Sequence, residues 1–256
     1  MAESLRGLRV LVPRAGAWGE RVRAEIENRG GVPIIAPLIE AQPPKHTAEL
    51  DRLLAEIQAG TVEWMFITSA STVEQLASRG VRIPATTQIA AVGRATARAL
   101  IEAGMHVDFL PAGQSSALEM VRQWCAKFPP GTVGSSVVLR GDLAMASVSD
   151  ELEVQGHTVE VGIMYRTVGV DLAPDVRSAL ERGEIDAVLL TAGSVARELH
   201  QQVPTLADHI VRVAIGPATT HAAEKLGLRV DLTAREQTIE AMLDALATIR
   251  SEERSE

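Results

Sequence analysis

Short polar loops follow the apolar segments of this chain and hold most of the residues that could do chemistry. Each loop offers a hydroxyl, a glycine or an arginine beside the start of an expected helix. A helix N-terminus presents unpaired N–H groups and a positive dipole end, so these loops can bind carboxylates or phosphates. Ser and Thr there are also common helix caps, so one hydroxyl alone indicates little. The candidate binding residues are Arg14, Thr68, Ser69, Gly93, Thr96, Arg140, Thr191, Ser194, Gly216 and Thr219.

Tyr165 is the only tyrosine of the chain, and it ends a long expected strand directly before Arg166 and Thr167. One interpretation is a structural tyrosine at the edge of a sheet. The other is a functional phenol near a cleft between two domains. The residues around it leave both interpretations open.

Several arrangements that would indicate a cofactor are missing from the sequence. No Gly-x-Gly-x-x-Gly follows the first strand, and neither a P-loop nor a Gly-x-Ser-x-Gly elbow occurs. The six histidines lack metal-site spacing, and most are expected in exposed loops or helices. The single Cys125 cannot form an internal disulfide or a cysteine-rich metal site. We therefore expect no metal and no nucleotide or flavin cofactor.

Composition and charge narrow the class of protein. An apolar fraction of 46% in 256 residues indicates one large or two small globular domains. A net charge of −8 and few aromatic residues argue against nucleic-acid binding. No apolar run could span a bilayer, and the first residues do not resemble a signal peptide. We expect a cytoplasmic protein that does not bind membranes.

The elements that must position the polar loops alternate between strand and helix, which predicts an α/β fold with parallel sheets. The strand at 32–39 contains two prolines, Pro33 and Pro37, so it is expected at a sheet edge or as a crossing segment. Strands are expected at 8–12, 32–39, 64–68, 88–92, 106–110, 136–139, 158–165, 187–190, 211–215 and 229–232. Helices are expected at 16–29, 46–60, 71–79, 94–103, 115–128, 145–155, 174–182, 194–202, 218–226 and 238–249.

Two internal repeats point to a duplicated domain. Residues 91–97 return at 214–220, an offset of 123 positions, and residues 10–14 parallel 136–140 at an offset of 126. Periods this long are too large for a solenoid and suit a duplicated domain.

The two offsets allow two domain arrangements. Two units could follow each other in tandem. Alternatively, residues 1–36 could pack with 170–256 while 41–163 form the other domain. The prolines within 33–44 favour a chain that crosses between domains, but the residues alone leave the choice open.

A series of short motifs runs through nearly the whole chain. They are Leu11-Val12-Pro13-Arg14, Pro37-Leu38-Ile39, Trp64-Met65-Phe66-Ile67-Thr68-Ser69, Ala91-Val92-Gly93-x-Ala95-Thr96-Ala97, Val161-x-x-Met164-Tyr165-Arg166-Thr167 and Ala214-Ile215-Gly216-Pro217-Ala218-Thr219. Each motif is weak by itself, and the ordered set is more specific. In this order the motifs resemble the uroporphyrinogen-III synthase family.

The resemblance implies a particular α/β fold. Two flavodoxin-like parallel-sheet domains, related by internal duplication, would be joined by a two-stranded linker. The crossed arrangement is then expected, with 1–36 plus 170–256 as domain 1 and 41–163 as domain 2. The interdomain linkers would be 37–40 and 164–169.

The resemblance also implies an activity. The enzyme would be a cofactor-free lyase that cyclises the linear tetrapyrrole hydroxymethylbilane, with loss of water and inversion of ring D. Tyr165 matches the family's candidate general acid, and Thr219 would line the cleft. Where the family often has Ser after a later strand, this chain has Ala192. Because the substrate carries eight carboxylates and the chain is net negative, local arginines such as Arg14 and Arg140 are expected to bind it.

The rival interpretation is a catalytically inactive, synthase-like ligand-sensing or regulatory domain. Such domains occur joined to DNA-binding modules, and no helix-turn-helix or basic segment is left over for that role. Periplasmic-type receptors share the two-domain plan but need export. The expected partners are the small-molecule substrate and, transiently, hydroxymethylbilane synthase, with the chain itself a monomer.

Overall fold

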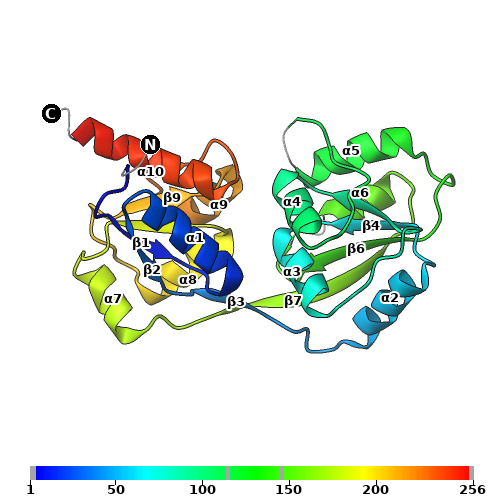
Figure 1. Ribbon diagram of the computed structural model, residues 1–256, viewed down its shortest axis with the longest axis horizontal. Coiled ribbons are helices and arrows are strands. Elements are labelled where there is room, and N and C mark those ends of the chain that lie inside the picture. Colours follow the sequence, from blue (N-terminus) through cyan, green and yellow to red (C-terminus); the bar gives the residue numbers. More distant parts are fainter. Residues whose placement is uncertain (1–3, 114–115, 145–146, 254–256) are drawn as a thin grey trace. The chain divides into compact units, whose positions relative to one another are not determined.

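The computed structural model describes residues 4–113, 116–144 and 147–253, which form two compact units (Figure 1). Unit 1 contains the chain up to Glu40 and again from Val168 on. Unit 2 contains Ala41–Thr167. The chain therefore begins unit 1, completes unit 2 and then returns to unit 1.

Unit 1 is a parallel sheet with helices. Its elements are β1 (Arg9–Val12), α1 (Gly16–Asn28), β2 (Val32–Ile35), α7 (Pro174–Glu181), β8 (Ala187–Leu190), α8 (Gly193–Gln202), β9 (Val211–Ala214), α9 (Pro217–Glu224), β10 (Leu232–Thr233) and α10 (Ile239–Glu253). The strand order is β10-β9-β8-β1-β2, and every pairing is parallel. The order reverses beside β1, and open sheets of this kind bind ligands outside the carboxyl ends of strands at such a point.

Unit 2 repeats this plan. Its elements are β3 (Ile39–Gln42), α2 (Ala48–Ala59), β4 (Trp64–Ile67), α3 (Ala70–Ser78), β5 (Gln88–Ala91), α4 (Arg94–Glu102), α5 (Ala117–Lys127), β6 (Ser136–Gly141), α6 (Ser147–Val154) and β7 (Glu160–Gly169). The strand order is β3-β7-β6-β4-β5. β4 pairs in parallel with β5 and β6, and β6 pairs in parallel with β7. The order reverses between β4 and β6.

The pairing registers of the two sheets coincide at the sequence offsets of 123 and 126. Residues that pair in unit 2 have counterparts that pair in unit 1. The matched pairs are Trp64–Gln88 with Ala187–Val211, Ala90–Phe109 with Val213–Leu232, and Trp64–Ser136 with Ala187–Val10. A side-chain contact follows the same offset: Asp108 Oδ2 accepts from Ile89 N, and Asp231 Oδ2 from Arg212 N, both at 2.8 Å.

Helices cover both faces of each sheet, which explains the uninterrupted apolar strands. β4 and β8 are buried at every residue, as is usual for parallel strands between two helical layers. In unit 1, α1 and α10 pack on one face, and α7, α8 and α9 on the other. In unit 2, α2, α3 and α4 pack on one face, and α5 and α6 on the other. Rigid cores therefore hold the strand ends that carry the polar loops.

The prediction of a single strand at 32–39 is wrong. Its first part forms β2, and its last residue begins β3, which lies in the other sheet. Pro33 and Pro37 cannot donate to a strand ladder. Between the two strands, Ala36 N donates to Val12 O and Leu38 N to Pro13 O, each at 3.0 Å. The chain thus passes the end of β1 before it joins the second sheet.

Other elements differ in extent. The strand expected at 106–110 is a single bridge at Phe109, and β10 has only two residues. β7 continues to Gly169, beyond the expected end at Tyr165. The expected helix starts at Ser115 and Met145 lie outside the described residues. Among the residues that are described, no helix is long and apolar enough to cross a membrane.

Candidate functional site

Tyr165 meets a hydroxyl loop at the carboxyl edge of the unit 2 sheet. β4 ends at Ile67, and Ser69 caps α3 by accepting a hydrogen bond from Thr72 N at 3.2 Å. The phenol oxygen of Tyr165 lies 3.4 Å from the same Ser69 Oγ. Typical O–H···O hydrogen bonds are about 2.7–2.8 Å, so this contact is loose. Either hydroxyl could be the donor, and in both cases the phenol is only weakly engaged by Ser69.

The ring of Tyr165 lies against Gly141, the last residue of β6. An added Cβ on Gly141 would come within 2.6 Å of Tyr165 Cζ and 2.8 Å of its oxygen. The β6–β7 register shifts between Arg140 and Gly141, so Gly141 pairs with Tyr165. A glycine and an irregular register together admit the phenol at this edge.

Arg140 is partly buried and bound to its own loop. Its Nη1 donates to Gly141 O at 3.4 Å and to the carbonyl oxygen of Ala144. Its Nε is buried and has no hydrogen-bond partner within the described part of the chain. Two backbone carbonyls thus use part of the hydrogen-bonding capacity of the Arg140 guanidinium, which the sequence predicted to bind substrate.

Thr68 and Thr191 occupy matching places after β4 and β8. The Oγ1 atom of each is buried and lacks a hydrogen-bond partner among the residues described. An unpaired buried hydroxyl is costly, about 1–3 kcal/mol, so such atoms merit a functional interpretation. Both hydroxyls lie at the carboxyl edge where ligands of parallel sheets bind.

Helix α4 begins just after β5, the strand that pairs with β4. Gly93 is the N-cap residue with extended backbone, and no side chain caps this end of the helix. Ala97 N donates to Gly93 O at 2.9 Å, while Thr96 is buried in the first turn, at 4% exposure. Gly93 leaves the helix end uncovered, while Thr96 contributes mainly to packing.

Unit 1 presents a similar edge without a phenol. Arg14 lies over the Trp18 ring at 5.0 Å. Ser194 falls in the first turn of α8, whose N-cap is Ala192, so its side chain is not the cap. Gly216 is the N-cap of α9, and Thr219 in the first turn is 7% exposed.

The structure therefore groups the predicted residues into two sets, one per unit. The unit 2 set is Thr68, Ser69, Gly93, Thr96, Arg140 and Tyr165, of which Ser69 and Tyr165 are in contact. The unit 1 set is Arg14, Thr191, Ser194, Gly216 and Thr219. Sequence reasoning did not assign roles to Gly141 and Asp142, although the loop Arg140-Gly141-Asp142 follows a strand as the other loops do.

The described residues contain no group of three or more His, Cys, Asp or Glu side chains placed to hold a metal ion. The fold and its loops define a class: α/β proteins with two parallel-sheet units that carry hydroxyls, glycines and arginines at their strand ends.

Comparisons with known proteins give the family within this class. The family model described as uroporphyrinogen-III synthase HemD matches residues 20–244. The chain belongs to the uroporphyrinogen-III synthase family, lyases of porphyrin biosynthesis. The curated relatives do not favour a sensing or regulatory domain.

Two relatives and one solved structure illustrate the match. The uroporphyrinogen-III synthase of Synechococcus elongatus is 25% identical, covering 96% of this chain and 97% of that protein. The porphyrin biosynthesis protein HemD of Ruminiclostridium josui is 27% identical over 97% of this chain, which spans 50% of that protein. The crystal structure of uroporphyrinogen-III synthetase from Helicobacter pylori shares the fold, with a TM-score of 0.65 and 17% identity, covering 96% and 100% of the two chains.

Proposed function

We propose that this chain converts hydroxymethylbilane to uroporphyrinogen III. The hydroxymethyl C–O bond on ring A breaks, and the departing hydroxide leaves as water with a proton from Tyr165. The resulting azafulvene cation is attacked by the substituted carbon of ring D. The spiro intermediate fragments and recloses with ring D inverted, and the proton lost on closure returns to the Tyr165 phenolate, so that the net change is the release of one water.

One observation carries this proposal: the only phenol of the chain lies at the carboxyl edge of a parallel sheet beside a serine hydroxyl. A weakly engaged O–H can donate to a leaving group, and such general acid assistance contributes roughly 10²–10⁴-fold. The unassisted ring closure gives the uninverted isomer, so holding the substrate in one conformation is the larger task.

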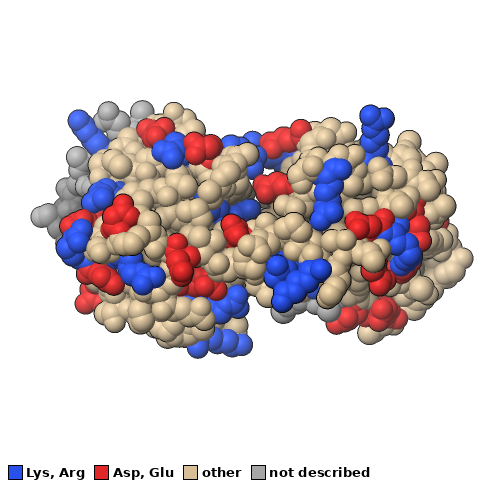
Figure 2. Space-filling view, turned by 90° about the horizontal axis from the view of Figure 1, so that it is seen from below, with Lys and Arg blue, Asp and Glu red and all other residues tan. Residues whose placement is uncertain are grey.

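Local groups rather than net charge bind the substrate's carboxylates in this proposal. In the face drawn in Figure 2, acidic and basic side chains are interspersed. A net charge of −8 opposes binding of a polyanion. We propose that Arg14, Arg140 and the helix N-termini at Gly93 and Gly216 bind carboxylates, with Thr68, Thr191, Ser194 and Thr219 as further contacts.

The test is to supply hydroxymethylbilane and to separate the type III and type I isomers of the product by chromatography. Predominant type III product supports the proposal. Type I product at the rate of the spontaneous reaction would overturn it and favour the ligand-sensing alternative.

We also propose that the two units arose by internal duplication. The support is the coincidence of strand order and pairing register at the two sequence offsets. Asp108 and Asp231 accept equivalent backbone hydrogen bonds, which extends the correspondence to side chains. Ser69 and Tyr165 have no hydroxyl-bearing counterparts, because the matching residues are Ala192 and Ile39.

We propose that the units are domains joined by the paired strands β3 and β7. The proposed domains are 1–36 with 170–256, and 41–163, with linkers at 37–40 and 164–169. Support comes from the passages between units, which fall after Glu40 and after Thr167.

We further propose a cytoplasmic monomer that contacts hydroxymethylbilane synthase transiently and needs no cofactor. Exhaustive chelation should leave its activity unchanged, and loss that added metal restores would contradict this.

A further inference from the structure

We propose that Asp142 and Gly141 are positioning residues for Tyr165; this inference depends on the proposed role of the phenol. Neither residue is proposed to contact the reacting atoms. They act by fixing the strand segment and the space in which the Tyr165 ring lies.

Strand β7 is irregular at Met164. Arg140 pairs with Ile163, whereas Gly141 pairs with Tyr165, so Met164 is an extra residue in the ladder. Successive residues of a regular strand point to opposite faces. Met164 and Tyr165 nevertheless pack against the same core cluster. A bulge of this kind redirects a side chain, here the phenol.

Asp142 forms hydrogen bonds to the backbone beside that bulge. Asp142 N donates to Tyr165 O at 3.0 Å, and Asp142 Oδ1 accepts from Thr167 N at 2.9 Å. The same Oδ1 also accepts from Leu143 N at 2.8 Å. β6 ends at Gly141, so the carboxylate supplies an acceptor where the main-chain ladder has ended. Asp142 therefore forms hydrogen bonds with the backbone of both neighbours of Arg166, Tyr165 and Thr167.

The Tyr165 ring fills the space next to the Cα of Gly141. Any side chain there would overlap the ring, since a Cβ would lie 2.6 Å from Tyr165 Cζ. The backbone of Gly141 is not in the left-handed region, so the requirement is for close approach and not for conformation. The atoms in conflict belong to the outer end of one side chain. Alanine should therefore displace the phenol without unfolding the unit.

The experiment uses the full chain and its single tyrosine. Tyrosine labelled with ¹³C at Cζ gives one resonance, that of Tyr165. We expect Gly141→Ala and Asp142→Ala to shift or broaden the Tyr165 resonance. Asp142→Asn should keep the chemical shift of the parent protein, because its amide oxygen can still accept from Leu143 N and Thr167 N. Asp208→Ala, which removes an exposed carboxylate elsewhere, is the matched control.

Kinetics supply the second measurement. Gly141→Ala and Asp142→Ala should lower kcat roughly 10- to 100-fold, with the loss on Tyr165→Phe as the upper limit, and change KM much less. Gly141→Ala should cause little further loss in a Tyr165→Phe background, because both changes remove one function.

Two results would overturn the inference. One is a resonance that stays unchanged in both Gly141→Ala and Asp142→Ala. The other is an Asp142→Asn variant as impaired as Asp142→Ala, which would mean that the negative charge matters rather than the acceptor. If Tyr165→Phe keeps full activity, the proposed role of Tyr165 fails, and the resonance still decides whether Gly141 and Asp142 position the ring.

Discussion

The loose contact between Tyr165 and Ser69, at 3.4 Å, leaves the phenol hydrogen free to engage a leaving group. Tyr165→Phe should therefore cut formation of type III product while the fold and much of the binding remain. We expect a loss near the lower end of about 10²–10⁴-fold, because the substrate can ionise unaided. The measurement is the initial rate of type III product, with the melting temperature as a check on folding. Full activity would remove Tyr165 from the mechanism.

Thr219→Val offers the comparison in unit 1. The sequence suggested that Thr219 could cap a helix, but Gly216 is the N-cap of α9. Removing the hydroxyl should therefore leave the melting temperature nearly unchanged. Reduced turnover at an unchanged melting temperature would indicate a substrate contact, whereas full turnover would exclude one.

His157 should make unit 2 less stable in acid. Its side chain packs edge-on to Trp124 at 4.9 Å, and the residue is 7% exposed. Burial lowers the pKa of His157 below its usual 6.5, although a hydrogen bond to the Phe128 backbone opposes this. The folded state thus favours the neutral ring, so its contribution is full above pH 6.5 and is lost as the pH falls.

The measurement for His157 is the free energy of unfolding by urea between pH 7.5 and 5. His157→Phe should flatten the decline, while His46→Gln, at an exposed site, should leave it as in the parent. An equally steep decline in His157→Phe would contradict the prediction. The sequence predicted mostly exposed histidines because it contains no information on the Trp124 contact.

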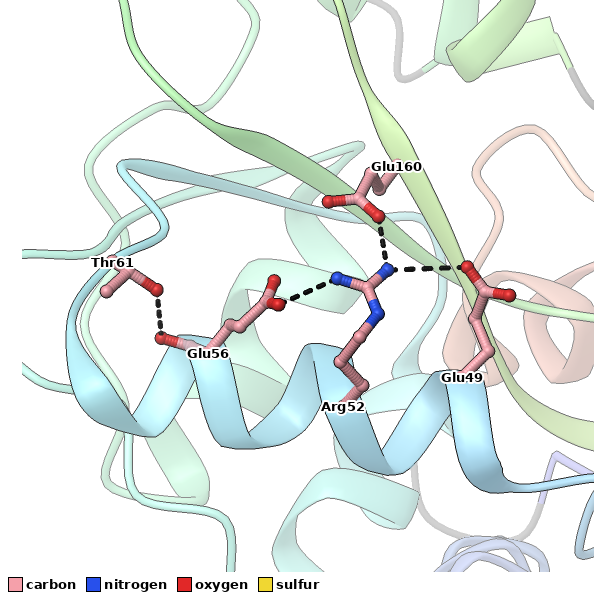
Figure 3. Close-up of polar contacts among 5 residues, drawn as sticks. All are labelled: Glu49, Arg52, Glu56, Thr61 and Glu160. Carbon is pink, nitrogen blue, oxygen red and sulfur yellow. Dashed lines mark hydrogen bonds and ion pairs between the residues drawn. The ribbon is translucent and has the colours of Figure 1, made fainter.

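At the scale of elements, one arginine links helix α2 to strand β7 (Figure 3). Arg52 bonds Glu56 at 2.7 Å, Glu49 at 3.4 Å and, across to β7, Glu160. The Glu160 contact is the main cause that raises the pKa of Arg52. Arg52 is 44% exposed at its side chain, so salt should screen these pairs.

Arg52→Ala should lower the melting temperature modestly in low salt, since three carboxylates lose their shared cation. The difference from the parent should shrink in 1 M NaCl. Arg98→Ala is the matched control, because its pair with Glu102 lies within one helix. A deficit that is equal in low and high salt would indicate lost packing instead of lost charge interactions.

The alternation of strands and helices was predictable because both sheets bury continuous apolar strands between helices. Ser69 as a helix cap follows from local sequence rules as well. The bulge at Met164 was not predictable, since it depends on the partner strand ending at Gly141. The division of 32–39 was only partly visible: the prolines mark a break, but not the change of sheet.

At the scale of the whole molecule, the proposed linkers at 37–40 and 164–169 would be the only covalent connections between the units, so we expect the units to move relative to each other. Small-angle scattering should show a distribution of shapes that narrows when product binds. A single rigid shape, unchanged by product, would contradict this expectation.

In the sequence, unit 2 lies between the two segments of unit 1, and this order has a consequence for synthesis on the ribosome. By Gly169 every strand of unit 2 has been made, so this unit can fold while the rest of the chain is still being translated. β1 and β2 come first from the ribosome, yet β1 must wait for β8, whose Ala187 pairs with Val10. Until β8 has been made, β1 and β2 can pair only with each other, and their apolar side chains remain exposed. The N-terminal segment is made first, and we expect it to be among the last parts of the chain to complete its sheet.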